Sequence, residues 1–499
     1  MIMLMKRGID TIIAAIITML LFTNVIVLAD DVTVLTSGNC GYKGADVTYT
    51  LTSDGVFTVS GTGDMDYYYP DENEQPTMPW INYCDNIKEI VIEDGVKNVS
   101  YGGFVYCNYL TKVTLASSVT SLDPDCFFGC GLLTDINCEN VAYVGEGAFA
   151  YCTVLNNVDF SKTTQICKNA FAHCYGLTDI TLGEGLKTIG ETAFYRCDKL
   201  ESINIPSTVT SIELGAFGRC YKLDNVKLPY GITAISNQTF MECSALSNIE
   251  IPITVKTIGF ASFALCPNIK NIELPEELTG IGQQAFFKCT ALENIEIPES
   301  VTNISTGAFA SCTSLNRIII PYNVTVINAN MFNGCTNLKS VEIPKNVTSI
   351  GSGVFAGCGN LSCVYLYEGS YADAFIAENN SSIQRKYITE DNAVAISDLD
   401  TANNTFTVLV DTDKLGGDPS IAGYLNEVNV LLDDTEQNVT NYRYSDDTQK
   451  YIAFDVQYIN TSNAENTALR GEAVTLDTED SSVFKYYVTS VLNIGMGGN

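Results

Sequence analysis

The middle of the chain repeats one pattern of hydrophobic and polar positions every 22 or 23 residues. Its general form is Ala-Phe-x-x-Cys-x-x-Leu-x-x-Ile-x-Ile-Pro-x-x-Val-Thr-x-Ile-Gly, and a phenylalanine precedes the cysteine by three positions in every copy from Phe104 to Phe355. Such a fixed period predicts a solenoid, in which each repeat forms one coil. The in-register cysteines are Cys84, Cys107, Cys130, Cys152, Cys174, Cys197, Cys220, Cys243, Cys266, Cys289, Cys312, Cys335 and Cys358.

Each copy predicts a coil with two short extended pieces. The apolar residues that end Leu-x-x-Ile-x-Ile are two apart, so they share one face of a strand, and equivalent strands of neighbouring coils are expected to pair in a parallel sheet. Prolines such as Pro206 and Pro229 follow this strand and end the ladder, because proline cannot donate a hydrogen bond. Val-Thr-x-Ile forms the second piece. We expect Ala-Phe-x-x-Cys to be a helical turn that places the phenylalanine in the core.

The first thirty residues have the layout of a secretory signal peptide. An apolar run from Ile12 to Leu28 follows two basic residues, and small residues precede a cleavage point between Ala29 and Asp30. The alternative is an uncleaved anchor, although about 17 apolar residues are at the short end for a bilayer span. We therefore expect residues 1–29 to be removed. The mature chain is then secreted or on the cell surface, without a membrane span.

Residues 81–368 resemble the BspA-type (Treponema pallidum-type) leucine-rich-repeat family of bacterial surface proteins. Gly61–Met65 and Pro79–Trp80 look like the entry segment of such arrays, and Gly369–Asn380 looks like the short helical segment that closes them. The resemblance implies a mainly β fold with short helical turns, a right-handed solenoid of about 23-residue coils. It also implies secreted or cell-surface proteins, some of them adhesins, and it brings no catalytic residues.

The flanks divide into three further expected regions. Residues 30–80 are expected to form an N-terminal β cap and residues 369–383 a helical closing segment. After about Gln384 the period gives way to alternation, which predicts a small β-sandwich-like domain over residues 384–499. Acids in this last region are candidates for weak calcium binding, the alternative being ordinary hydration in loops: Asp411, Asp413, Asp433 and Asp434. The alternating segments are Thr405–Val410, Val428–Leu432, Tyr451–Val456 and Val483–Leu492.

The net charge of the chain disfavours some classes of binding partner. With 27 basic and 58 acidic residues the net charge is −31, which disfavours nucleic acid and anionic lipid because both need basic contacts. The single histidine, His173, leaves little room for a histidine-based triad or a multi-histidine metal site. We therefore expect no catalysis, no cofactor and no metal centre. Basic proteins, cations and neutral glycans remain compatible partners.

The in-register cysteines have two interpretations. Residues stacked one coil apart lie within disulfide range, yet their side chains point in parallel and each has two equivalent neighbours. We favour a ladder of buried thiols that fill the core as small apolar groups. Cys363 falls on an outward strand position and is the candidate for a reactive or paired thiol.

Outward positions of the strand stack into two columns on the expected concave sheet. The glutamates would lie about 5 Å apart and repel each other. The groups that could offset this repulsion are the neighbouring asparagine amides, a lysine such as Lys270, bound cations or a basic ligand. The functional interpretation is a recognition stripe for an extracellular protein or glycan; the alternative is a solvated face produced by repeat duplication. The column residues are Asn225, Asn248, Asn271 and Asn294, with Glu250, Glu273 and Glu296 two residues beyond three of them.

A second candidate is the acidic aromatic stretch from Asp64 to Glu72, which is either a loop with calcium or glycan affinity or a packed turn of the cap. We favour the packed turn, because no EF-hand spacing is present, and we expect Trp80 to cap the first coil. Three functions follow: an adhesin-like binding protein, a structural envelope or matrix protein that self-associates, and, with least support, an enzyme using a carboxylate pair in the C-terminal region.

Overall fold

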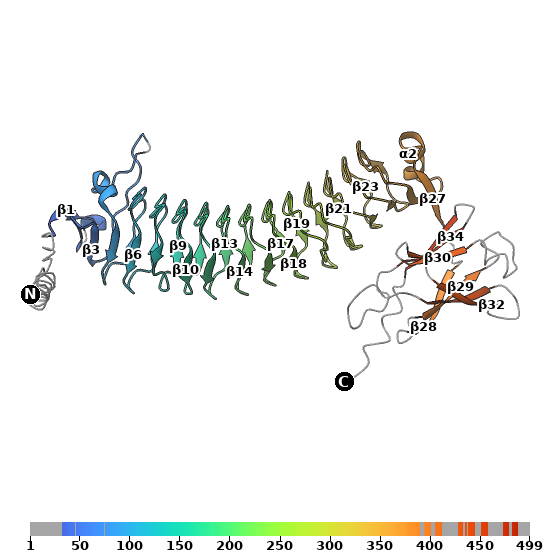
Figure 1. Ribbon diagram of the computed structural model, residues 1–499, viewed down its shortest axis with the longest axis horizontal. Coiled ribbons are helices and arrows are strands. Elements are labelled where there is room, and N and C mark those ends of the chain that lie inside the picture. Colours follow the sequence, from blue (N-terminus) through green and yellow to red (C-terminus); the bar gives the residue numbers. More distant parts are fainter. Residues whose placement is uncertain are drawn as a thin grey trace, which may run out of the picture.

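The computed structural model describes residues 32–389 apart from Ala45 and Glu74, and beyond them the backbone of strands β28 to β35. Its repeats form a mainly β solenoid whose coils stand side by side in a row (Figure 1). Ala29 and Asp30, at the expected cleavage point, lie outside the described residues. None of the described helices is long and apolar enough to cross a membrane.

The longer strand of each coil pairs in parallel with its neighbours, as the pattern predicts. On these strands the buried residues alternate with exposed ones, for example Val226 between Asn225 and Lys227. In the two coils without a long strand, an isolated parallel bridge joins Asn271 to Asn294. The long strands are β4 (Glu89–Ile92), β6 (Lys112–Leu115), β8 (Asp135–Ile136), β10 (Asn157–Phe160), β12 (Asp179–Leu182), β14 (Ser202–Asn204), β16 (Asn225–Lys227), β18 (Asn248–Glu250), β22 (Arg317–Ile319), β24 (Ser340–Glu342) and β26 (Cys363–Leu366).

A second ladder is built from the Val-Thr-x-Ile pieces. The pieces pair with the same positions of neighbouring coils in three separate runs, and the isoleucine or leucine side chain is buried in most coils. The pieces are β5 (Asn98–Val99), β7 (Ser121–Leu122), β9 (Tyr143–Val144), β11 (Gln165–Ile166), β13 (Thr188–Ile189), β15 (Ser211–Ile212), β17 (Ala234–Ile235), β19 (Thr257–Ile258), β20 (Gly280–Ile281), β21 (Asn303–Ile304), β23 (Val326–Ile327) and β25 (Ser349–Ile350).

The Ala-Phe-x-x-Cys segment is not a helical turn, so this expectation was wrong. From Cys107 to Cys358, the residues five and one before each in-register cysteine have left-handed backbone, with φ from 50° to 77°. Thr192, Phe194 and Arg196 donate their N–H groups to carbonyls of the next coil at 2.8–2.9 Å, while the N–H groups between them close turns within the coil. A helix would direct all its N–H groups along its own axis. The alternation instead lets every second one bind the neighbouring coil.

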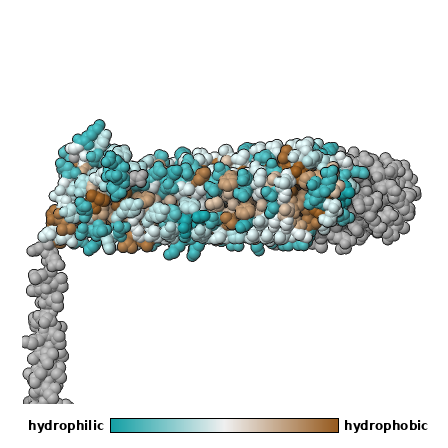
Figure 2. Space-filling model, turned by 90° about the horizontal axis from the view of Figure 1, so that it is seen from above, coloured by the Kyte–Doolittle hydropathy of each residue, from teal (hydrophilic) through white to brown (hydrophobic). Residues whose placement is uncertain are grey.

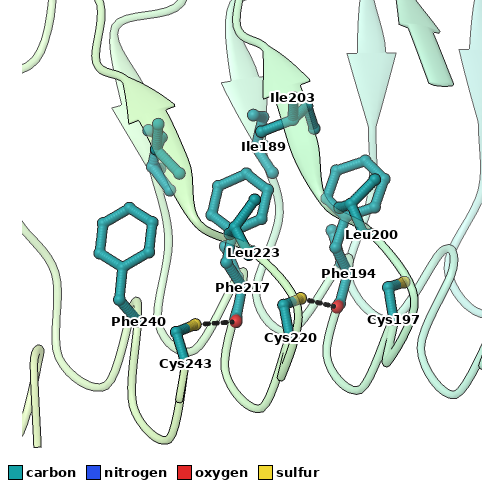
Figure 3. Packing of buried hydrophobic residues seen from close by; sticks show 14 of the residues in the cluster. Ile189, Phe194, Cys197, Leu200, Ile203, Phe217, Cys220, Leu223, Phe240 and Cys243 are labelled. Atoms are coloured by element: carbon teal, nitrogen blue, oxygen red, sulfur yellow. Dashed lines mark hydrogen bonds between the residues drawn. The ribbon is translucent and has the colours of Figure 1, made fainter. Parts of the chain in front are cut away.

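Phenylalanine fills the core, as the pattern predicts. The rings from Phe104 to Phe355 stack in one column, with centroids of successive rings 5.3–6.3 Å apart and planes within 25° of parallel. Leu200 and Leu223 pack beside this column in Figure 3. Because each ring is covered by the rings of two neighbouring coils, the core exists only in the assembled array.

All 18 cysteines are thiols, and most are buried. From Cys130 to Cys358, each in-register Sγ lies 3.0–3.4 Å from the carbonyl oxygen of the phenylalanine one coil earlier. Figure 3 shows two of these bonds, from Cys220 to Phe194 and from Cys243 to Phe217. The phenylalanine carbonyl also accepts an N–H of its own coil, so the thiol occupies its second acceptor site. The thiol is therefore a hydrogen-bond donor as well as the apolar filler that we expected.

A small antiparallel sheet and an aromatic cluster close the N-terminal end. Trp80 is fully buried and contacts the rings of Tyr49, Phe57 and Phe104, and its indole N–H donates to a backbone carbonyl at 2.8 Å. Strand β3 pairs in parallel with β4, so the cap and the solenoid share one sheet. The cap elements are β1 (Val34–Asn39), the 3-10 turn η1 (Tyr42–Gly44), β2 (Asp46–Thr52), β3 (Val56–Thr62) and the 3-10 turn η2 (Ile81–Asn86).

The C-terminal end is closed by helix α2 (Tyr371–Asn379), which starts at Ser370, whose hydroxyl accepts the N–H of Asp373. Strand β27 (Gln384–Thr389) then pairs in parallel with β26, and β35 pairs with β27. One of the two sheets that contain strands of the C-terminal region therefore continues a solenoid sheet. The remaining strands are β28 (Val394–Asp400), β29 (Thr405–Asp411), β30 (Val428–Leu432), β31 (Thr435–Glu436), β32 (Asn438–Tyr444), β33 (Tyr451–Gln457), β34 (Ala473–Thr478) and β35 (Ser482–Tyr487).

Candidate functional site

The two predicted columns lie on the exposed side of the long strands. All four asparagines and all three glutamates are solvent-exposed. Asn225 is in register with Asn248 across β16 and β18, and Asn271 with Asn294 across the isolated bridge. Lys227 lies in register with Glu250, so a basic side chain stands at the start of the glutamate column. These pairings place two pairs of the asparagines side by side in neighbouring coils.

Two shallow hollows lie on this side of the solenoid, and only the asparagine column reaches them. One has a volume of about 830 Å³ and includes Asn225; the other, of about 360 Å³, includes Asn294. None of the three glutamates lines either hollow. The larger hollow is lined by Glu201, Ser202, Lys222, Asp224, Asn225, Ala245, Ser247, Asn268, Lys270 and Ala291. The smaller is lined by Glu293, Asn294, Ser314, Asn316, Asn337, Lys339 and Asn360.

Both hollows occupy the same repeat positions, two, four and five residues after the cysteine. At the fourth position the backbone forms a ladder of its own: Asn316 donates its N–H to the carbonyl of Glu293 at 3.1 Å, and Lys339 donates to Asn316 at 2.8 Å. This ladder holds successive side chains along one line just before the strand. We call the surface made by these three positions, from Glu201 to Asn360, the polar groove.

The chemistry of the polar groove is that of amides and hydroxyls more than of net charge. The Asn360 amide donates to the Asn337 side chain at 3.3 Å, and the Ser247 hydroxyl donates to Asp224 at 2.5 Å. Lys222 pairs with Glu201 at 3.3 Å, but both side chains are more than half exposed, so this pair contributes little. Amides present donors and acceptors together. The groove therefore suits a ligand with many hydrogen-bonding groups, such as an extended peptide or a glycan.

Most residues of the polar groove lie outside the outward strand positions that the repeat pattern singled out as a candidate site. The signal was present in the column two residues after the cysteine, which contains Asn268, Ser314, Asn337 and Asn360. Seen from above, the solenoid surface is a mosaic of hydrophilic and hydrophobic residues without one continuous stripe (Figure 2).

The acidic aromatic stretch of the cap is packed at two positions and exposed at most of the others. Met65 and Tyr68 are buried, and the Asp71 carboxylate accepts the N–H groups of Asn73 and Gln75 at 2.8 Å. Among the described residues, no three His, Cys, Asp or Glu side chains group closely enough to hold a metal ion. The side chains of Asp411, Asp413, Asp433 and Asp434 lie outside the described residues.

Comparison with solved structures shows the fold. A leucine-rich repeat protein from Bacteroides ovatus is 23% identical, with a TM-score of 0.53 over 69% of this chain and 98% of that one. A leucine-rich cell surface protein from Faecalibacterium prausnitzii is 25% identical, with a TM-score of 0.42 over 70% of this chain and 98% of its own. The pneumococcal vaccine antigen PcpA is 16% identical, with a TM-score of 0.39 over 71% and 98%. No curated protein was found to match.

The repeats also match a described family, the BspA type leucine-rich repeat region, over residues 81–166, 153–266 and 256–374. These overlapping matches span more than half of the 499 residues. The period, the two strand ladders and the stacked core agree with this assignment, and the chain therefore belongs to the BspA-type leucine-rich-repeat family.

Proposed function

We propose that this protein is a secreted or cell-surface binding protein, adhesin-like, and that its polar groove holds an extracellular protein or glycan. The observation that carries the proposal is the regularity of the groove: side chains at the same three positions of successive coils, most of them amide, hydroxyl or charged, line both hollows. The signal-peptide layout ending at Ala29 supports export. A regular row of donors and acceptors suits a ligand that is itself extended.

The groove is rigid, which favours binding. Its residues are attached to backbone that is hydrogen-bonded from coil to coil, as at Asn316 and Lys339. A preorganised surface loses less conformational entropy when it binds than a loop does. Glu250, Glu273 and Glu296 flank the groove and remain candidate contacts for basic groups of the ligand.

The test is binding of the mature chain, starting at Asp30, to an array of matrix proteins, mucins and glycans. A groove variant combines Asn294→Ala, Asn316→Ala and Asn337→Ala, and a column variant combines Glu250→Gln, Glu273→Gln and Glu296→Gln. Glu276→Gln, on an exposed turn away from the groove, is the matched control. We expect the groove variant to lose saturable binding and the control to keep it.

The outcomes separate the alternatives. Loss of binding in the column variant alone would assign the ligand to the glutamates, and unchanged binding in both variants would place the site elsewhere. If the chain binds nothing in the array and instead assembles with itself as its concentration rises, the structural alternative replaces the proposal.

A further inference from the structure

The turn edge of the first coils is apolar and aromatic. Around their cysteines, residues 104–110, 127–133 and 149–155 contain no Asp, Glu, Lys or Arg, in a chain with 85 such residues (27 + 58). The large side chains here face solvent instead of the core: Tyr106 is 54% exposed, Tyr109 55%, Leu132 46%, Tyr151 42% and Val154 39%. With the half-buried Phe128, they form what we call the apolar edge.

The aromatic members of the apolar edge form a continuous row. Tyr106 and Phe128 lie 5.5 Å apart between ring centroids, Phe128 and Tyr151 lie 5.4 Å apart, and Tyr151 stacks on His173 at 4.4 Å. Leu132 and Val154 occupy one repeat position in successive coils, two residues after the cysteine, on the other side of the same turns. Exposed contiguous apolar surface of this kind marks interaction sites on soluble proteins.

The fold does not require these residues. At the position of Leu132 and Val154, later coils carry Lys199 and Lys222 and still close in the same way. The position of Tyr106 and Tyr151 has left-handed backbone, with φ of 55° and 63°, and glycine occupies it in three other coils at Gly129, Gly334 and Gly357. A side chain there is disfavoured by about 1–2 kcal/mol. Tyr106 and Tyr151 therefore reduce the conformational stability of their turns relative to glycine.

The rim of the apolar edge is acidic. Asp125 and Glu146 lie beside it at the start of the turns, where Asp125 donates its N–H to the Glu146 carbonyl, and the exposed Asp135 lies on the strand side. Burial, and after it the Glu146 charge, raise the pKa of Asp125. Two basic residues near this rim are already paired: Lys112 of β6 with Glu89 at 2.8 Å, and Lys168, one coil after Glu146, with Glu191 at 3.2 Å.

We propose that the apolar edge is a docking site for a partner protein that presents an apolar segment flanked by lysine or arginine residues. Tyrosine is among the side chains enriched at the energetic centres of protein interfaces, and an acidic rim attracts a basic partner and orients it. A second copy of this chain fits poorly, because both copies carry a net charge of −31. This site lies on the first coils, before the polar groove begins at Glu201, although Leu132 and Val154 occupy a repeat position that lines the groove further along the array.

The test uses a fluorescent peptide, acetyl-Lys-Lys-Leu-Trp-Leu-Lys-Lys-amide, titrated with the mature chain and followed by anisotropy. Two control peptides replace the apolar centre with Ser-Gly-Ser or the lysines with glutamates. We expect saturable binding of the first peptide and binding at least about tenfold weaker for each control, since one loses apolar burial and the other meets like charge.

The key variant combines Leu132→Lys and Val154→Lys, substitutions that the fold accepts at this position in two later coils. It should weaken binding of the parent peptide about tenfold or more, by placing like charge within the patch. The matched control combines Tyr230→Lys and Ile253→Lys, at exposed apolar residues one coil apart that belong neither to the apolar edge nor to the polar groove, and should bind as the parent does. Thermal melting followed by circular dichroism verifies that all chains are folded.

Three results would overturn the proposal: no saturable binding of the parent peptide, unchanged binding by the Leu132→Lys and Val154→Lys variant, or an equal loss in the matched control. The groove variant with Asn294→Ala, Asn316→Ala and Asn337→Ala should keep peptide binding. The two sets of variants therefore test the polar groove and the apolar edge independently of each other.

Discussion

Each in-register cysteine and the residue immediately before it are adjacent in the chain but follow opposite rules. Cys107 is fully buried and Tyr106 is 54% exposed. The cysteine is the same in every coil, as is the phenylalanine three residues before it from Phe104 to Phe355. The preceding residue changes along the array, through Tyr106, Gly129, Tyr151, His173, Arg196, Arg219, Glu242, Leu265, Lys288, Ser311, Gly334 and Gly357.

The difference shows what a solenoid constrains. An inward side chain contacts the equivalent side chains of the two neighbouring coils. Every copy must therefore have the same shape and the same hydrogen-bonding role. An outward side chain at the turn meets solvent, and its backbone conformation is unusual but independent of the side chain's chemistry. The residue type is therefore the same in every coil at these interior positions. At the turn edge the residue type can differ from coil to coil, and so can the chemistry of the surface. Four predictions test this comparison.

The largest expected effect is alkaline unfolding. Burial raises the pKa of Cys220 and Cys289 from 9.0 to about 12, and it raises the pKa of the other in-register thiols from Cys107 to Cys358 as well. Unfolded thiols ionise above pH 9 while folded ones stay protonated. Each thiol's contribution is therefore complete below pH 9 and declines as pH rises toward 12, by about 1.4 kcal/mol per pH unit.

Because about a dozen thiols act together, the melting temperature in a reducing buffer should fall steeply above pH 9. Replacing Cys220 with valine should make this fall slightly shallower. A melting temperature that stays level from pH 8 to pH 11 would show that the thiols are not buried as described.

The second largest expected effect is a difference in stability loss between an interior phenylalanine and the phenylalanine of the apolar edge. Phe217→Ala removes a fully buried ring between two stacked neighbours, and we expect a loss of about 3–5 kcal/mol in the free energy of unfolding. Phe128→Ala removes a half-buried ring of the apolar edge and should cost about 1 kcal/mol. Urea unfolding at pH 7 measures both. Equal losses would contradict the comparison between interior and edge.

A smaller effect tests what the cysteine does. If the Cys220 thiol acts as a donor to the Phe194 carbonyl, Cys220→Ser retains a donor and should be more stable than Cys220→Ala by about 1 kcal/mol. If the thiol is only an apolar filler, the order reverses. Urea unfolding of the two variants at pH 7 decides between the two roles.

The smallest effect concerns the left-handed position before the cysteine. Ser311 has φ of 61°, and Ser311→Gly removes a penalty of about 1–2 kcal/mol while adding about 0.5–1 kcal/mol of chain entropy in the unfolded state. We expect stabilisation of a few tenths to about 1 kcal/mol. Ser311→Val should instead destabilise the chain, because branched side chains fit this backbone poorly. Thermal melting compares the two, and a glycine variant less stable than the valine variant would refute the assignment of strain.

Much of the fold was predictable because the sequence pattern that indicates it returns in every coil. About a dozen copies of the repeat indicate the same period, the same inward isoleucines on the long strands and the same phenylalanine column. An exceptional residue in one copy therefore does not change the predicted fold. The turn containing Phe194 and Cys197 was mispredicted as helical, because Thr192 and Arg196 are ordinary residues without the glycine that usually marks left-handed backbone.

The candidate site was predicted in part. The register of Asn225 with Asn248 follows from the period alone, and so does their exposure. That Asn294 lines a hollow and Glu296 does not depends on how the chain bends between the cysteine and the strand. The same bend joins Asn316, Asn337 and Asn360 into the polar groove, although neighbouring members are 21 or 23 residues apart in the chain.

The sequence by itself determined the period, the inward and outward positions of the strands and the extent of the array, because a regular repeat converts sequence spacing directly into spatial register. Only the tertiary structure decided the backbone of the turns, the donor role of the thiols and the surfaces that the coils build together. Each of these depends on a contact between one coil and the next, such as the bond from Cys220 to Phe194. No single copy of the repeat contains both partners of such a contact.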